Sequence, residues 1–139
     1  MTKKILEDAD IGRISMCKNG DPYVVPICFV YFDGSIYFHS KKTGKKIDYI
    51  KSNPKVCFQI DDHEISLSKD PCKSTMKYRS AIIYGKAEVL KDEKDKINVL
   101  KKMIEKYDKN STTSGQIKDV SGVEVFKIKI EDITWKSNI

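Results

Sequence analysis

The chain contains few arginines, histidines and tryptophans, and it has no long apolar segment. Of its 26 basic residues, all but two are lysines. No stretch approaches the roughly 20 consecutive apolar residues that a membrane-spanning helix needs. The N-terminal residues lack the apolar core and the small-residue cleavage site of a secretory signal. We therefore expect a cytoplasmic protein that does not cross a membrane.

The scarcity of arginine also bears on nucleic-acid binding. The net charge of +6 arises from lysines that are interleaved with acidic residues along the chain. Nucleic-acid-binding proteins usually present arginine clusters or aromatic platforms on a basic face, and neither is evident here. The lysines are therefore interpreted as solvated surface residues, and no nucleic-acid partner is expected. A polyanion-binding β-barrel is the least favoured function.

Cysteine and histidine are too few and too irregularly spaced to predict a metal site. The cysteines form no Cys-x-x-Cys pair, and neither of the two histidines lies at ligand spacing from them. The chain of 139 residues has the length of one domain, over 1–139, and can form a hydrophobic core without disulfides. We expect reduced, mostly buried thiols. The cysteines are Cys17, Cys28, Cys57 and Cys72.

The hydrophobic pattern predicts a mainly β fold with peripheral helices. Asn19-Gly20 and Asp33-Gly34 have the composition of tight hairpin turns, so the first three strands are expected to form an antiparallel meander. The expected strands are 11–17, 22–32, 36–39, 55–61, 78–90 and 123–135, the expected helices are 4–10, 44–52 and 92–107, and loops are expected over 63–77 and 108–121. Such an arrangement predicts a six-stranded antiparallel barrel.

The segment that follows the third strand has the composition of a phosphate site. The strand ends at Ser40, and a glycine and several lysines precede a helix that Thr43 is expected to cap. The Ser40 hydroxyl and the first backbone N–H groups of the helix, at Gly44, Lys45 and Lys46, would converge on one point, as a phosphate monoester requires. Lysines at this end oppose the helix dipole, which an intervening anion would explain. The alternative is a solvated lysine-rich turn.

Pro26 and Arg79 are unusual residues for the strands in which they occur. Pro26 removes a ladder hydrogen bond from an apolar strand, so we expect it on an edge or a bulge, where a flat ring could use the freed backbone groups. Arg79 enters an apolar strand between Tyr78 and Ser80, and we expect it to meet an anion or a carboxylate. The alternatives are a plain edge-strand proline and an ion pair at the barrel rim.

The sequence contains no recognisable set of catalytic side chains. It has no Ser-His-Asp order, no paired-carboxylate motif, no phosphate-binding Walker loop and no Gly-x-Gly-x-x-Gly motif. His39 could be a general acid, a stacking ring or a structural residue at the end of a strand. Chemistry, if the chain performs any, is therefore expected to be carried by a cofactor.

Several motifs in order resemble the pyridoxamine 5'-phosphate oxidase-like family of FMN-binding split-barrel proteins. The similarity is greatest to its nitroimidazole-resistance branch, and it covers roughly residues 5–107. The matching motifs are Gly12-Arg13-Ile14, Tyr23 to Phe29, Ile36 to Ser40, Gly44-Lys45-Lys46, Asn53 to Phe58, Tyr78-Arg79-Ser80 and Tyr84 to Ala87.

The resemblance implies an FMN cofactor at the interface of a homodimer. It places Val25, Pro26, Ile27 and Cys28 beside the flavin ring and His39 next to the ring or the ribityl chain, where His39 is the one candidate catalytic residue. It also assigns the flavin phosphate to Ser40, Gly44, Lys45 and Lys46. Tyr78, Arg79 and Ser80 would approach the cofactor from the long strand.

The implied function is an oxidoreductase that reduces nitroaromatic or other small redox compounds, with NAD(P)H as a candidate donor. The segment 130–139 lacks the arginines with which true pyridoxamine-phosphate oxidases hold the substrate phosphate, so vitamin B6 oxidation is not expected. The alternative function is a non-catalytic module that binds flavin or haem for storage or sensing.

Overall fold

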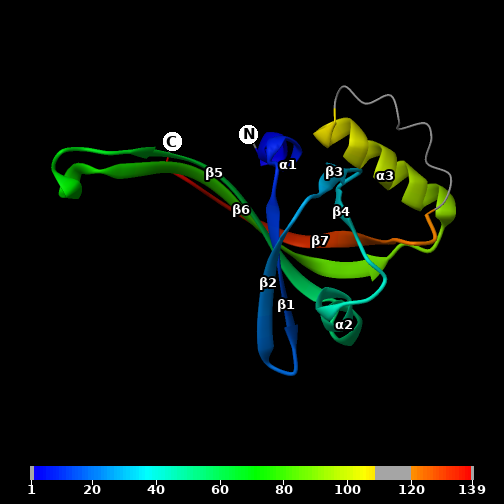
Figure 1. Cartoon of the computed structure of the whole chain (residues 1–139). Helices are drawn as coiled ribbons and strands as arrows, with labels where there is room; N and C mark the ends of the chain where they lie inside the picture. Colours follow the sequence, from blue (N-terminus) through cyan, green and yellow to red (C-terminus); the bar gives the residue numbers. More distant parts are fainter. Residues whose placement is uncertain (1, 109–119, 139) are drawn as a thin grey trace.

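Seven strands form one antiparallel sheet in the order β2-β1-β5-β6-β7-β4-β3 (Figure 1). The structure is a computed structural model that describes residues 2–108 and 120–138. The elements are α1 (Thr2–Asp8), β1 (Gly12–Lys18), β2 (Asp21–Ile27), β3 (Val30–Phe32), β4 (Ser35–Ser40), α2 (Lys45–Ser52), β5 (Lys55–Ser66), the 3₁₀ turn η1 (Pro71–Lys73), β6 (Thr75–Val89), α3 (Glu93–Tyr107) and β7 (Glu124–Ser137). The predicted mainly β split-barrel fold is confirmed, with seven strands where six were expected.

The extra strand arises because the apolar run over 22–32 is not one strand. β2 ends at Ile27 and pairs with β1, whereas β3 begins at Val30 and pairs with β4, so the two lie at opposite edges of the sheet. The predicted three-stranded meander is therefore wrong. At the break, the Phe29 N–H donates to Tyr107 Oη at 3.0 Å, and the Phe29 carbonyl accepts from Lys106 Nζ at 2.8 Å. Because α3 supplies these partners, the backbone groups of Phe29 remain hydrogen-bonded where the chain leaves β2.

Both predicted hairpin turns are present. Asn19 and Gly20 have φ values of 52° and 84°, and Asp33 and Gly34 have values of 50° and 73°. Two successive residues with positive φ are the signature of a type I′ turn, whose twist matches that of the flanking strands. The turns therefore formed as their composition predicts, although the strands between them pair differently.

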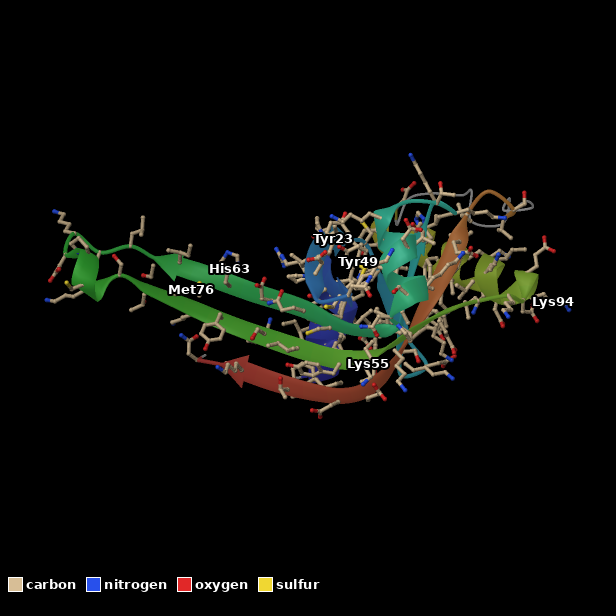
Figure 2. The ribbon with its side chains drawn as sticks, turned by 90° about the horizontal axis from the view of Figure 1, so that it is seen from below. Tyr23, Tyr49, Lys55, His63, Met76 and Lys94 are labelled. Atoms are coloured by element: carbon tan, nitrogen blue, oxygen red, sulfur yellow. The ribbon has the colours of Figure 1, made fainter. Side chains whose placement is uncertain are left out.

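The predicted loop over 63–77 is also wrong, because β5 and β6 continue through most of it. Their ladder extends to the pair Ser66 and Thr75, and only a short tip with η1 joins them. We call the paired segments 61–66 and 75–80 the arm, which projects from the barrel in Figures 1 and 2. Side chains on both faces of the arm are mostly exposed in the single chain, so its sequence lacks the alternation by which a half-buried strand is predicted.

Aromatic rings fill the centre of the barrel. Phe38 stacks on Phe126 with ring centroids 5.1 Å apart, and Phe29 meets Phe58 edge-on at 4.9 Å. These four phenylalanines have no exposed surface. A Cβ atom at Gly12 would lie 2.0 Å from Phe58, so only glycine leaves room for that ring.

Helices α1, α2 and α3 cover the sheet at different places (Figure 1). The predicted helix over 4–10 is present as α1. Asp92, the first residue of the predicted helix 92–107, caps α3 by accepting from the Lys94 N–H at 2.8 Å. No helix among the described residues is long and apolar enough to span a membrane. Residues 109–119 of the predicted loop 108–121 lie outside the described part of the chain.

The expectation that most of the cysteines are buried is wrong. Cys28 and Cys72 are exposed, and Cys17 and Cys57 are half-buried. Cys28 lies at the break after β2 and Cys72 lies at the arm tip, both outside the packed interior. Their positions follow from the break and the arm, which the sequence pattern did not reveal.

Candidate functional site

The corner between β4 and α2 presents the uncapped start of a helix. Gly44 is the N-cap residue, with φ 135° and ψ 174°, a conformation that residues with a side chain rarely adopt. The predicted N-cap, Thr43, is therefore wrong by one residue, although the predicted helix is present. Glycine has no side chain with which to cap the helix, so the first backbone N–H groups of α2 receive no side-chain acceptor.

Two lysines in the first turn of α2 are held by aromatic rings. Lys45 Nζ lies 4.4 Å from the centroid of the Tyr23 ring and 5.6 Å from that of Tyr49, which ties α2 to β2 (Figure 2). Lys46 is half-buried with its Nζ 5.8 Å from the Phe38 ring centroid, and burial lowers the pKa of this lysine. Neither lysine forms an ion pair with any described residue. We call Ser40, Gly44, Lys45 and Lys46 the cationic corner.

A cavity of about 470 Å³ lies at His39, the residue that precedes Ser40 of this corner. It is lined by Cys28, His39, Leu100, Met103, Ile104, Tyr107 and Asp108. Partial burial and the positive charge of Lys46 lower the pKa of His39, which favours the neutral imidazole. A neutral imidazole offers one hydrogen-bond donor and one acceptor. The cavity has the size and the mostly apolar lining that are typical of sites for small organic molecules.

The residues predicted to face a flavin ring lie at the edge of the sheet. Val25 is half-buried opposite Ile14, Pro26 is exposed opposite Arg13, and Ile27 is buried. Because β2 is an edge strand, the expectation that Pro26 occupies an edge is confirmed. An edge strand leaves a row of backbone groups available to a ligand or another chain.

The last turn of α3 contributes residues that the sequence did not single out as part of a site. Lys106 Nζ lies 3.8 Å from the centroid of the Phe29 ring, and burial lowers its pKa to about 8. Tyr107 Oη donates to the Asp10 carbonyl at 2.7 Å, and burial raises the pKa of this tyrosine to about 12. Leu100, Ile104 and Tyr107 recur at the helical period in the sequence, but such a period indicates only which side of a helix is buried.

Arg79 lies at a different place, at the base of the arm. Its Nη2 is 2.5 Å from Asp62 Oδ2, and Arg13 Nη1 is 3.8 Å from Asp61 Oδ1. Both arginines of the chain line a cavity of about 380 Å³ next to α1. The expectation that Arg79 meets a carboxylate is confirmed. Within one chain, Arg79 does not line the cavity at His39, and its half-buried neighbours Tyr78 and Ser80 also lie on the arm.

The chain has the architecture of a split-barrel protein. Its antiparallel sheet coils into a barrel, and a hairpin projects from that barrel. The family model described as pyridoxamine 5'-phosphate oxidase matches residues 2–137. The chain therefore belongs to the pyridoxamine 5'-phosphate oxidase family, as the motifs predicted.

Several solved structures have the same fold. A candidate 5-nitroimidazole antibiotic resistance protein from Bacteroides thetaiotaomicron is 28% identical, with a TM-score of 0.79 over 96% of this chain and 80% of its own. A FAD-binding protein from Mesorhizobium loti is also 28% identical, with a TM-score of 0.66 over 96% of this chain and 89% of its own. The flavocytochrome Anf3 from Azotobacter vinelandii shares the fold alone, at 18% identity and a TM-score of 0.82 over 99% of this chain and 65% of its own.

A curated relative is an uncharacterised protein from Rhizobium meliloti. It is 29% identical over 86 residues, which are 62% of this chain. The matched region spans half the length of that relative.

Proposed function

We propose that the chain is a cytoplasmic, FMN-dependent oxidoreductase that reduces nitroaromatic or other small redox compounds. The observation that carries the proposal is the juxtaposition of the cationic corner with the cavity at His39 and Cys28. A phosphate at the corner and a ring system along the exposed edge of β2 would place the ring beside this cavity. Similarity at 28% identity to a FAD-binding protein and to a candidate nitroimidazole resistance protein supports this function.

The cationic corner fits the phosphate of FMN. The open N–H groups at the start of α2 and the ammonium groups of Lys45 and Lys46 would donate to the phosphate oxygens. Ser40 Oγ, which donates to the Lys41 carbonyl at 3.0 Å, could turn to the same anion. Because the rings of Tyr23 and Phe38 already position the two lysines, little side-chain freedom would be lost on binding.

The edge strand fits the ring of the flavin. The exposed edge of β2 at Val25 and Pro26 would offer backbone groups to the polar rim of the ring. When bound, FMN would supply transfer of a hydride or of single electrons between NAD(P)H and the acceptor. The imidazole of His39 would donate a hydrogen bond to the ring or to the acceptor, and Lys46 would favour negative charge nearby.

We further propose that two copies of the chain associate through the arm. Ile65, Leu67 and Met76 have exposed fractions of 61%, 84% and 48%, an apolar exposure that a second copy would cover. His63 and Met76 mark how far the arm extends from the barrel (Figure 2). The family resemblance assigns Tyr78, Arg79 and Ser80 to the cofactor, and such a dimer would let them approach the flavin of the partner.

The proposal is tested by the absorption spectrum of the purified protein and by titration with flavins. We expect flavin bands, tighter binding of FMN than of FAD, and oxidation of NAD(P)H that depends on a nitroaromatic or quinone acceptor. Protein that binds FMN but transfers no electrons to any acceptor would instead support a flavin-storage or sensing module. Colourless protein that does not bind FMN would refute both functions.

A further inference from the structure

We propose that the cavity beneath α3 binds the acceptor substrate and selects uncharged, flat molecules over phosphorylated ones. Leu100 and Ile104 of α3 would be the specificity-determining residues. The inference rests on the proposed function, because it places the acceptor against a flavin held by the corner and by β2. The inference adds to that function the residues of α3 that contact the acceptor and the chemical class of the acceptor.

The position of the cavity connects it to both predicted flavin-binding strands. Cys28 enters the lining from the end of β2, and His39 enters it from the end of β4. The opposite wall is formed by the second half of α3. An acceptor must approach the flavin closely for electron transfer, and a flat molecule in this cavity would lie between the ring and the helix.

The chemistry of the lining excludes a strongly charged ligand. Leu100, Met103 and Ile104 contribute apolar surface, and Asp108 supplies the one carboxylate that the described residues place in the lining. Among residues 2–108 and 120–138, no lysine or arginine lines this cavity. A phosphate buried there would lose its water without gaining a cationic partner, and Asp108 would repel it.

The nearest basic residues are engaged elsewhere. Lys106 follows Ile104 by two positions, but its Nζ donates to the Phe29 carbonyl at 2.8 Å. Lys46 belongs to the cationic corner and would bind the flavin phosphate. The remaining polar groups, the neutral imidazole of His39 and the Cys28 thiol, suit a nitro or quinone oxygen that accepts a hydrogen bond.

The test uses the FMN-loaded protein and two substitutions in α3. Ile104→Phe reduces the space in the cavity, and Leu100→Lys places a cation in its wall. Ile97→Phe is the matched control, because Ile97 is also half-buried on α3 but does not line the cavity. Dissociation constants are measured for FMN by flavin fluorescence. Those for metronidazole, menadione and pyridoxamine 5'-phosphate are measured by perturbation of the flavin absorption bands.

We expect Ile104→Phe to weaken binding of metronidazole and menadione about tenfold or more, since pockets of this kind discriminate single groups by roughly 10–200-fold. FMN affinity should change less than twofold. The control, Ile97→Phe, should bind FMN and the acceptors as the unmodified protein does. Leu100→Lys should weaken binding of the two uncharged acceptors and strengthen binding of pyridoxamine 5'-phosphate. If Ile104→Phe does not fold, Ile104→Ala should strengthen binding of a bulkier anthraquinone relative to menadione.

Two results would overturn the inference while leaving the proposed function intact. One is bound FMN with acceptor affinities that neither α3 substitution changes. The other is a loss of FMN affinity in Ile104→Phe as large as the loss of acceptor affinity, which would mean that the flavin itself fills the cavity. A protein that binds no FMN at all would refute the proposed function and the inference together.

Discussion

Two basic regions of the molecule differ in what lies opposite their charges. At the base of the arm, Arg13 and Arg79 each face an aspartate of β5. At the cationic corner, Lys45 and Lys46 lie against aromatic rings, and the described residues provide no carboxylate for either. The first region neutralises itself within one chain, whereas the second presents charge that an external anion can use. The comparison shows that the number of basic residues does not identify an anion site, but that the partners of those residues do.

Removal of the cationic corner should have the largest effect on cofactor binding. We expect Ser40→Ala combined with Lys46→Ala to weaken FMN binding by a few kcal/mol, since each charge-assisted contact contributes about 1.5–3 kcal/mol. The measurement is fluorescence titration of the apoprotein with FMN. Lys51→Ala is the control, because Lys51 lies in the last turn of the same helix. Equal affinities for the double variant and the control would show that the phosphate binds elsewhere.

Gly44→Ala tests whether the open helix start depends on glycine. The position has φ 135°, and a Cβ atom there would meet nothing within 4 Å, so the cost would be backbone strain alone. We expect a loss of about 1–2 kcal/mol in the free energy of unfolding together with weaker FMN binding. Urea denaturation and flavin titration check the two effects, with Gly122→Ala as a control whose added Cβ also meets nothing within 4 Å. Unchanged stability would contradict the assignment of strain to this cap.

Arg79→Ala tests whether the base of the arm is only a self-neutralised ion pair. Because the Arg79 and Asp62 side chains are 31% and 58% exposed, we expect the monomer to lose no more than about 1 kcal/mol of stability. If the arm reaches a partner's flavin, dimer stability or FMN affinity should fall as well. Analytical ultracentrifugation and flavin titration measure these quantities, with Arg13→Ala as the matched variant. If neither dimer stability nor FMN affinity changes, Arg79 serves only in an ion pair at the rim of the barrel.

Lys106 differs from both basic regions, because its partner is a backbone carbonyl rather than an anion, and we expect its effect to be smaller. Its pKa in the folded protein is about 8, below the ordinary 10.5, because burial disfavours the charged form. The unfolded chain therefore binds more protons between these values, and stability should rise with pH above about 8. The raised pKa of Tyr107 makes stability fall as pH rises, but only above about pH 10. Urea denaturation between pH 8 and 10 should show the rise in the unmodified protein and lose it in Lys106→Met.

Local signals in the sequence predicted the elements whose causes are local. The two type I′ turns follow from Asn-Gly and Asp-Gly, the start of α3 follows from Asp92, and the edge position of Pro26 follows from its missing N–H. The ordered motifs also predicted the family and the split-barrel fold. In each case, neighbouring residues or a pattern of motifs carry the information.

Long-range partners account for the errors. The break after Ile27 depends on Lys106 and Tyr107, which are more than 75 positions away in the chain. The arm was not recognised because its strands are exposed on both faces and show no alternation. The α3 wall of the cavity at His39 could not be located from a helical period alone, because that period indicates a buried side but not which surface covers it.

The sequence by itself therefore determined the turns, the main helices, the lysine-rich corner and the family, because these depend on backbone preferences and on the order of short motifs. Only the tertiary structure decided which strands pair, which basic residues have acidic partners and where the cavity lies. The physical reason is that hydrogen bonds and ion pairs join residues by distance in space, and a single sequence records only distance along the chain.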